Sequence, residues 1–419
     1  MHNTSTHKEV YSGGKELIEQ VEQSARRHPN QKDDAKHFFY FSQNLSLSRY
    51  ADSNAVNVMA DYIIEQSDYS PSQQSYKDLY RHHVILIILN LSRCIMHRQF
   101  CKIPLDAGAF GKGNSYDKLS YKNFRRAIDV LDALGFIELI KGAKYSAGGQ
   151  RSVMQPASVM SRSALYAYLE SEDWSDPPYV KVSKQGESGH LSPADIEQIK
   201  IDEKDMLLIN DFLRSHTWAA KSSIRRLYSG RVGSAGRLYC SYQQLPKRRI
   251  PIRNYCLIDG EPLVEVDLKA SHPRLAVALF HGEKLEREFY DNVFEATDVF
   301  QSKVKAFCQN AFSCDSRLAA LNSFKKNKPN GNEKDFNEIE TYMLSRFPKL
   351  PYYSSWSLIA MNYEGEIIKK VMLEGVRNNI VVLPVHDAVA VQTKHKEWAE
   401  KTMIRCWNEI VGFDGCEVD

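Results

Sequence analysis

The chain has 419 residues, of which 43% are hydrophobic and 26% charged, and 55 lysines and arginines against 52 aspartates and glutamates leave a formal charge of +3. This balance excludes a disordered acidic chain and a polycationic one, and at roughly 150 residues per domain the length predicts two to three domains. The longest apolar runs, such as Val84 to Leu89, are far shorter than the roughly 20 residues that span a bilayer, and no apolar targeting segment opens the sequence. We therefore expect a cytoplasmic protein.

The eight cysteines contain no C-x-x-C pair. The usual ligand spacing of a structural zinc site is therefore missing, and we expect ordinary reduced thiols.

The first 75 residues are polar and aromatic and indicate no function, so residues 1–75 are treated as an N-terminal extension. Residues 76–168 begin with a strongly apolar helix, Tyr76 to His97. A second helix starts at Ser120 and carries an apolar face, and an alternating strand then leads into a basic hairpin rich in glycine. This order resembles a winged-helix domain, which implies that Lys122, Arg125 and Arg126 on the exposed face of the second helix approach a DNA groove. Winged helices also dock proteins, so that alternative stays open.

The stretch 169–193 is rich in turn formers and is interpreted as a linker. In 194–250, a helix from Asp195 to Arg214 is expected to act as an interdomain brace.

The stretch from Lys221 to Ile258 has nine basic residues and no acidic one, with four tyrosines between them. Because cations neutralise phosphates and aromatic rings stack on bases, this composition is typical of a nucleic-acid track, or otherwise of a solvated basic face. The nine are Lys221, Arg225, Arg226, Arg231, Arg237, Lys247, Arg248, Arg249 and Arg253.

Two apolar strands each end in a carboxylate. They are Leu263–Asp267 and the segment from Ile380 to Asp387. The two aspartates are far apart in sequence, yet they can meet on neighbouring strands of one sheet. Paired aspartates at about 4 Å suit two Mg²⁺ ions, because hard cations take oxygen ligands.

The order of motifs around these aspartates resembles family-A DNA polymerases. Gly236-Arg237-Leu238, Gln243-Gln244-Leu245-Pro246 and Arg253 precede the first strand, as a Gly-Arg-Leu, a Gln-x-x-Pro and an arginine do in that family. Asp267 to Arg274 is similar to motif A, and Val385-His386-Asp387 is similar to motif C. The resemblance covers Lys221 to Val391 and depends on the order of several weak motifs.

The resemblance implies roles for further residues. Ser302 to Asn310 stands in the place of the fingers helix that grips the incoming triphosphate, which makes Lys303 and Lys305 the candidate phosphate ligands. The two are two positions apart on a helix and point to different sides, and we favour Lys305. His272 and Arg274 become nucleotide-binding candidates, although Arg274 can equally pair with a buried acid. His386 is expected either to orient the primer end or to fill the turn.

The chain also departs from the family. His272 stands where deoxynucleotide-polymerising members carry a glutamate and the phage RNA polymerases a glycine, which leaves sugar choice open with a lean toward deoxynucleotides. Ala388 replaces the glutamate or serine that follows the motif C aspartate. The fingers segment lacks the arginine before its lysine and the tyrosine after it.

The resemblance implies an α+β fold: a helical N-terminal region with a winged-helix-like domain, then a palm sheet at 251–419 with a helical fingers insertion at about 283–350, and thumb-like helices within 194–250. It implies a template-directed DNA polymerase-like nucleotidyltransferase that binds primer-template DNA and nucleoside triphosphates. Two Mg²⁺ ions, or Mn²⁺ in their place, would be held by Asp267 and Asp387. About 220 residues precede the match, so no editing exonuclease is expected.

Three alternatives stay open. One is a primase, RNA polymerase or terminal transferase on the same palm. The second is a replication or regulatory factor that binds DNA without catalysis. The third is a nuclease using the same metals, which would not need the fingers segment. An element-borne replication role is a hypothesis from architecture.

Overall fold

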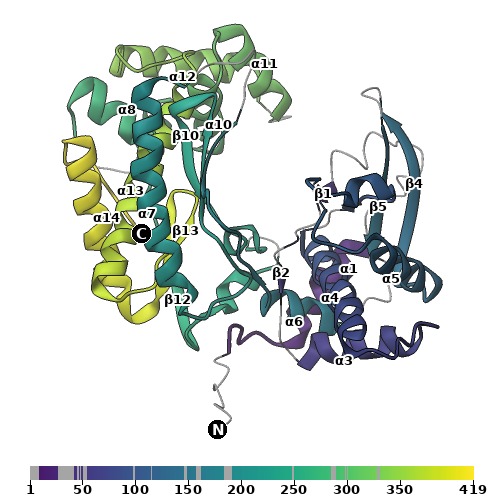
Figure 1. Cartoon of the computed structure of the whole chain (residues 1–419). Helices are drawn as coiled ribbons and strands as arrows, with labels where there is room; N and C mark the ends of the chain where they lie inside the picture. Colours follow the sequence, from purple (N-terminus) through teal and green to yellow (C-terminus); the bar gives the residue numbers. More distant parts are fainter. Residues whose placement is uncertain are drawn as a thin grey trace. The chain divides into compact units, whose positions relative to one another are not determined.

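The computed structural model describes residues 9–26, 42–44, 47, 49–50, 54–97, 100–114, 116–145, 149–156, 162–183, 191–247, 250–284, 289–297, 299, 301–327 and 331–419. The chain forms two compact units, and each is assembled from separate stretches of sequence. Unit 1 comprises Met1–Ser175, Thr217–Ser223 and Gln244–Pro262, and unit 2 comprises Asp176–His216, Ile224–Gln243 and Leu263–Asp419. Helices mixed with small sheets confirm the α+β class (Figure 1).

Unit 1 is mainly helical. Its helices are α1 (Lys15–Arg26), α3 (Asn54–Glu65), α4 (Gln74–His97), α5 (Tyr121–Ala133) and α6 (Arg162–Leu169), with 3-10 turns at Ala107–Phe110 and Ile252–Tyr255. The central helix α4 packs against α3, α5 and α6, because its residues from Leu86 to Leu91 are almost fully buried. Apolar side chains on all sides of the middle of a helix require neighbours on all sides, which explains its central place.

The strands of unit 1 form two small sheets. One has the order β1-β3-β5-β4, with β1 parallel to β3 and the other pairs antiparallel; the other has the order β2-β6-β8. Their bounds are β1 (Ser42–Asn44), β2 (Arg49–Tyr50), β3 (Phe100–Ile103), β4 (Ile137–Tyr145), β5 (Gly149–Pro156), β6 (Glu172–Asp173) and β8 (Lys221–Ser222), and β11 (Leu257–Ile258) pairs with the start of β12.

Helix α5 shows how local sequence sets these elements. The side chain of Ser120 caps it by accepting a hydrogen bond from the backbone N–H of Asn123, and Phe124, Ala127 and Ile128 are buried on one side. Gly135, with φ of 71°, follows the end of the helix and the chain turns into the β4–β5 hairpin. The winged-helix interpretation of residues 76–168 stays a prediction.

Unit 2 holds two further sheets. In the first, β7 (Val180–Ser183) runs parallel to β9 (Arg225–Ser229), which pairs antiparallel with β10 (Arg231–Tyr239). In the second, β12 (Glu261–Asp267), β14 (Ala388–Gln392) and β13 (Leu383–Val385) are antiparallel, with β14 in the middle. β14 is buried at every position, as expected for a central strand.

The helices of unit 2 are α7 (Pro193–Arg214), α8 (Ser271–His281), α9 (Phe289–Thr297), α10 (Gln301–Ser313), α11 (Arg317–Asn327), α12 (Glu333–Arg346), α13 (Trp356–Asn378) and α14 (Lys396–Val411). Helices α10, α11 and α12 gather at one end of the unit (Figure 1). They lie within residues 283–350, where a fingers insertion is expected, and that assignment stays a prediction. Helix α7 begins with a capping box between Ser192 and Asp195.

Helix α13 crosses β10 at very close range. A Cβ atom on Gly365 would lie 2.1 Å from the carbonyl oxygen of Gly236, so a side chain at this position is incompatible with the crossing. The glycine pair thus lets α13 pack closely against β10, and Arg237, which follows Gly236, meets Glu364, which precedes Gly365.

Two expectations about organisation differ from the structure. The stretch 169–193 is not a plain linker, because Glu172–Asp173 forms β6 and Val180–Ser183 forms β7, with Tyr179 and Val180 buried. The sequence pattern did not predict these strands, because each contributes few apolar residues and turn-forming residues surround them. Residues 1–75 and 244–262 belong to unit 1 together with the 76–168 stretch, because a compact unit is decided by contacts between distant segments.

Within the described ranges, the structure contains no helix with the length and apolarity needed to cross a membrane. All eight cysteines lie in described positions as free thiols.

Candidate active site

The two strand-end aspartates lie side by side in unit 2. The β12–β14 register pairs Asp267 with Ala388, and the backbone N–H of Leu268 donates to the carbonyl oxygen of Asp387 at 3.2 Å. Val266 and Val389, which precede and follow the two acids along the strands, are fully buried and fix this register. Asp267 is exposed and Asp387 is half-buried. The structure therefore brings together two carboxylates separated by 119 intervening residues in the sequence.

Both carboxylates line a cavity of about 800 Å³. Helix α10 contributes Lys305, β10 contributes Arg237 and α13 contributes Glu364 to the same lining. A cavity of this size is large enough for a nucleotide-sized ligand. The acids and bases that line it come from five different elements of unit 2, so the tertiary fold assembles them.

A buried carboxylate anchors the polar side of this cavity. Glu364 is fully buried and accepts hydrogen bonds from Arg237, whose Nε lies 2.8 Å away, and from the hydroxyl of Ser271. The Nε2 atom of His272 lies 3.2 Å from Oε1 of Glu364, the oxygen that Ser271 also contacts, whereas Arg237 contacts Oε2. Burial alone raises the pKa of Glu364, but the opposing effects of His272, Arg237 and Ser271 prevail and lower it to about 2. Glu364 is therefore ionised and ties together three neighbours of the aspartates.

The pKa of Asp387 is shifted in the opposite direction, upward. Burial raises its pKa above the ordinary aspartate value, and the negative charge of Glu364 adds to this rise. Arg237 and His272 reduce the shift without cancelling it. The charge of Asp387 is thus incompletely compensated by the protein, and a bound cation would favour its ionised form.

The donor chemistry fits magnesium. Asp267 and Asp387 supply hard oxygen donors at the end of the β12–β14 strand pair that borders the cavity. Mg²⁺ is typically held by one or two carboxylates, while water and substrate phosphates complete its coordination shell. Among the described residues, no three His, Cys, Asp or Glu side chains are grouped so as to enclose a metal ion by themselves. The two aspartates fit an ion that shares its ligands with a substrate.

The two fingers lysines have different surroundings. Lys305 lines the cavity, with its Nζ 5.8 Å from the centre of the Tyr290 ring. Lys303 forms an ion pair with Asp335 of α12 at 2.6 Å and is largely buried. Lys303 therefore joins α10 to α12, which does not favour the nucleotide-binding role considered for it.

Three other candidates are placed as follows. His272 lies in the cavity lining between Glu364 and Arg237. Arg274 is buried outside the lining and forms an ion pair with Glu417, an acid that is partly exposed and not buried as the alternative interpretation expected. His386 is exposed, with φ of 60°, and its backbone N–H donates to Gln243 at 3.3 Å.

The expected basic track is not a continuous surface. Arg226 is fully buried, and Lys221 and Arg253 are also buried, because each is needed inside the fold as an ion-pair or hydrogen-bonding group. Arg237 lies in the cavity and Lys247 is exposed. Arg248 and Arg249 lie outside the described residues. The prediction of one solvent-facing track was wrong for the buried positions, since composition cannot distinguish an internal arginine from a surface one.

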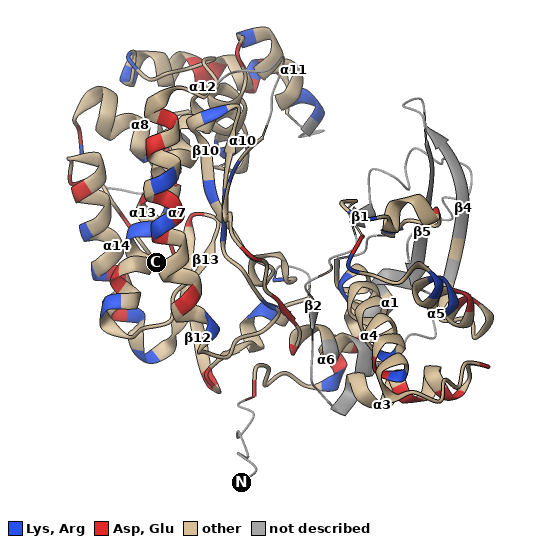
Figure 2. Cartoon of the chain, in the orientation of Figure 1, with Lys and Arg blue, Asp and Glu red and all other residues tan. Residues whose placement is uncertain are grey.

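The basic residues of α5 are visible in Figure 2. Lys122 is exposed, Arg125 pairs with Asp129 at 2.8 Å, and the guanidinium of Arg126 lies 3.8 Å above the centre of the Tyr69 ring. They border a hollow of about 610 Å³. A DNA contact at α5 stays a prediction, and of the three side chains Lys122 is the most exposed.

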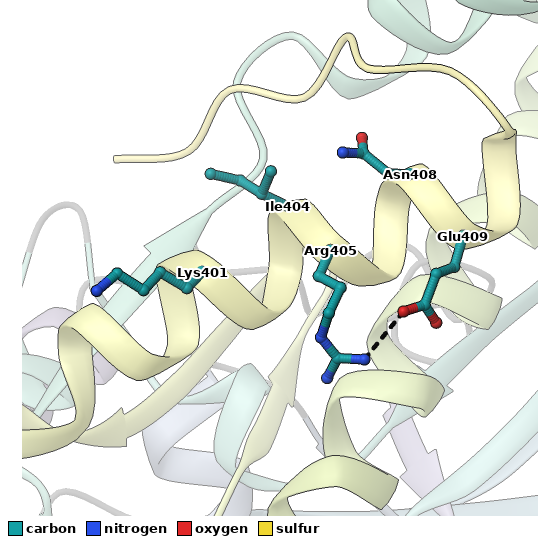
Figure 3. Close-up of a pocket in the computed structure, with 5 residues that line it drawn as sticks. All are labelled: Lys401, Ile404, Arg405, Asn408 and Glu409. Atoms are coloured by element: carbon teal, nitrogen blue, oxygen red, sulfur yellow. Dashed lines mark hydrogen bonds and ion pairs between the residues drawn. The ribbon is translucent and has the colours of Figure 1, made fainter.

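A different hollow, of about 460 Å³, lies along α14 and is lined by Lys401, Ile404, Arg405, Asn408 and Glu409 (Figure 3). Arg405 and Glu409 pair with each other at 3.0 Å, and Lys401 pairs with Glu397 at 2.5 Å. Because its lining comes from one helix and its charges are mutually compensated, it is a weaker site candidate than the cavity at the aspartates.

Sequence reasoning missed Ser271, Glu364 and Asp419 as lining residues. Ser271 directly precedes His272, so proximity in sequence was an available signal. Glu364 lies on α13, and its contact with Arg237 depends on the glycine crossing between α13 and β10. Nothing in the sequence indicates the position of Asp419.

Comparison with known proteins gives little further support. No family model matches the chain, and no curated protein matches it. Among solved structures, it is similar to the POL domain of Pol1 from M. smegmatis in complex with DNA primer-template and dNTP, with 12% sequence identity and a TM-score of 0.30. The match covers 96% of this chain and 68% of that one. A TM-score this low carries no argument about fold or function.

Proposed function

We propose that this protein is a template-directed DNA polymerase-like nucleotidyltransferase that joins deoxynucleotides to a primer 3′-hydroxyl. The observation that carries the proposal is the β12–β14 register, which sets Asp267 beside Asp387 in a cavity that Lys305 also lines. Two acids from neighbouring strands and one base from a helix are the charges that phosphoryl transfer requires, because the reaction is accelerated mainly by positioning and electrostatics.

Each residue has a role in this proposal. Bound Mg²⁺ would activate the attacking hydroxyl and stabilise the leaving phosphate. Asp267 and Asp387 hold the cations. Lys305 offsets negative charge on the triphosphate, and Arg237 is held by Glu364 so that its guanidinium borders the same cavity. His272, fixed between Glu364 and Arg237, restricts space at the sugar and supports the deoxynucleotide preference.

Nucleic-acid binding is proposed for a further set of basic residues. Lys247 and the neighbouring Arg248 and Arg249 would contact phosphates, His386 would lie near the primer end, and α5 would contribute through Lys122. The buried Arg253 is left to a structural role. Neutralising Lys247, Arg248 and Arg249 should weaken binding uniformly across nucleic-acid sequences and reduce its salt dependence.

The test is extension of a labelled primer on a DNA template with Mg²⁺. Parallel reactions contain deoxynucleotides, ribonucleotides, no template or no primer. Asp267→Ala and Asp387→Asn should each lower incorporation at least about 10³-fold while DNA binding persists, because the metals serve chemistry rather than affinity. The matched control is Asp211→Ala, at an exposed position of α7, which should retain activity.

The other nucleotidyltransferases and the non-catalytic factor each predict a different outcome. Product with ribonucleotides alone, without primer, or without template would replace the proposal with an RNA polymerase, a primase or a terminal transferase. DNA binding without product in any reaction would favour the non-catalytic factor. Full extension by both aspartate variants would refute the active-site assignment.

A further inference from the structure

The last described residues of the chain extend the sheet that carries Asp267. The backbone N–H of Asp267 donates to the carbonyl oxygen of Asp419 at 3.3 Å, and the N–H of Asp419 donates to Asp267 at 3.2 Å. Lys269 donates to Glu417 at 2.9 Å, and Leu268 forms an antiparallel bridge with Val418. Glu417–Asp419 thus acts as an additional edge strand beside residues 267–269.

This pairing sets two carboxylates opposite each other. Asp267 and Asp419 exchange both backbone hydrogen bonds, and residues of such a pair project their side chains on the same face, with Cα atoms about 5.5 Å apart. Asp419 also lines the cavity together with Asp387 and Lys305. Like charges directly opposite one another destabilise a sheet, so packing alone does not explain an aspartate here.

A side-chain clasp holds the added strand in place. The carboxylate of Glu417 pairs with Arg274 and lies 3.3 Å from the Nζ atom of Lys269. Arg274 is 3% exposed and also donates to the carbonyl oxygen of Gly415 at 3.5 Å. Arg274 lies in the first turns of α8, and Asp267 ends β12 just before the short loop that leads into this helix, so the contact helps to hold the edge strand in register with the aspartate.

We infer that Asp419 is a further acidic residue of the active site, positioned by the Arg274–Glu417 clasp, and that its charge increases the affinity of the site for divalent cations. The inference rests on the proposed function. Asp419 acts through its field rather than as a third ligand, because the described carboxylates do not enclose an ion by themselves. Arg274 and Glu417 are positioning residues in this scheme.

The first test measures cation binding directly. Mn²⁺ affinity is determined by electron paramagnetic resonance for the full chain, for Asp419→Asn and for Asp267→Asn. The matched control is Asp414→Asn, in the same segment but paired with Lys284 outside the cavity. One charge at this range from a divalent ion predicts an affinity about three- to tenfold weaker for Asp419→Asn, with Asp414→Asn unchanged. Asp419→Glu should restore it.

The same variants are compared in primer extension and in thermal unfolding. Asp419→Asn should raise the Mg²⁺ concentration for half-maximal rate by the same factor, leaving the rate at saturating Mg²⁺ and the melting temperature near wild type. Glu417→Gln should shift the Mg²⁺ requirement in the same direction, because the edge strand is then held less firmly.

The outcomes separate the inference from the proposed function. If Asp267→Asn weakens Mn²⁺ binding and Asp419→Asn does not, the inference is overturned and the proposed function stands. If neither weakens it, the site itself is wrong and both fail. A lower melting temperature without any change in cation affinity would give Asp419 a purely structural role, which also overturns the inference.

Discussion

Unit 2 contains two clusters of charged side chains that share helix α13 and differ in solvent access. In the first, Arg226 is fully buried and pairs with Asp202 at 2.9 Å and with Glu366 at 2.7 Å. Lys369 joins the same Asp202 at 2.6 Å. We call this set, Asp202, Arg226, Glu366 and Lys369, the buried network.

The second cluster lines the cavity, and we call Arg237, Glu364, Asp267, Asp387 and Lys305 the cavity cluster. Glu364 is satisfied by its neighbours, but the pKa of Asp387 remains raised, first by burial and then by the charge of Glu364. In the buried network, burial raises the pKa of Asp202, yet Arg226, Lys369 and Tyr228 outweigh it and lower the value. Internal compensation indicates a structural role, whereas a charge that the protein leaves incompletely compensated indicates a ligand.

The largest expected effect comes from breaking the buried network. Arg226→Met removes the fully buried cation that pairs with both Asp202 and Glu366 and leaves Lys369 as their remaining basic partner. Removing one member of a buried ion pair costs about 3–5 kcal/mol in the free energy of unfolding. Urea titration followed by circular dichroism measures this loss. Arg225→Met, at the half-buried position next to it, is the matched control and should cost far less. Equal losses for both variants would remove the distinction between the two clusters.

A somewhat smaller effect concerns Glu364 and acid. Its pKa falls from 4.5 to about 2 in the folded protein, so the stability from its ionised form is fully present above pH 4.5 and is lost as the pH falls toward 2. This pKa shift corresponds to on the order of 3 kcal/mol in the free energy of unfolding. Glu364→Gln lacks this dependence, so its stability should approach that of the wild type on acidification. Unfolding midpoints at pH 6, 4 and 3 measure the convergence, and parallel profiles would contradict it.

The smallest of these effects tests which lysine of α10 belongs to the cavity cluster. Lys305→Ala should raise the apparent KM for nucleotide about 10- to 100-fold, the value of one or two charge-assisted hydrogen bonds to phosphate. Lys303→Ala removes the contact with Asp335 and should leave KM near wild type, with a modest loss of stability. Steady-state kinetics of both variants test the pair. A larger KM effect for Lys303 would reverse the assignment of the two lysines.

Much of the local structure could be read from sequence. The helix expected from Tyr76 to His97 is observed at Gln74–His97, and the one expected from Asp195 to Arg214 at Pro193–Arg214. Capping residues and apolar periodicity are local signals, so they survive without tertiary information. The short strands within 169–193 were missed because two- and four-residue strands carry too little pattern to outweigh surrounding turn formers.

The sequence by itself determined the candidates for chemistry: two apolar strands that each end in an aspartate, and a helix with Lys303 and Lys305. Only the tertiary structure decided which charges are buried. Arg226 and Arg237 belong to the same basic stretch, yet one is enclosed in the buried network and the other borders the cavity. Tertiary structure also brought Glu364 and Asp419 to the aspartates, through a glycine crossing and an added edge strand. The physical reason is that ionisation and solvent access depend on neighbours in space, and those neighbours come from segments far apart in the chain.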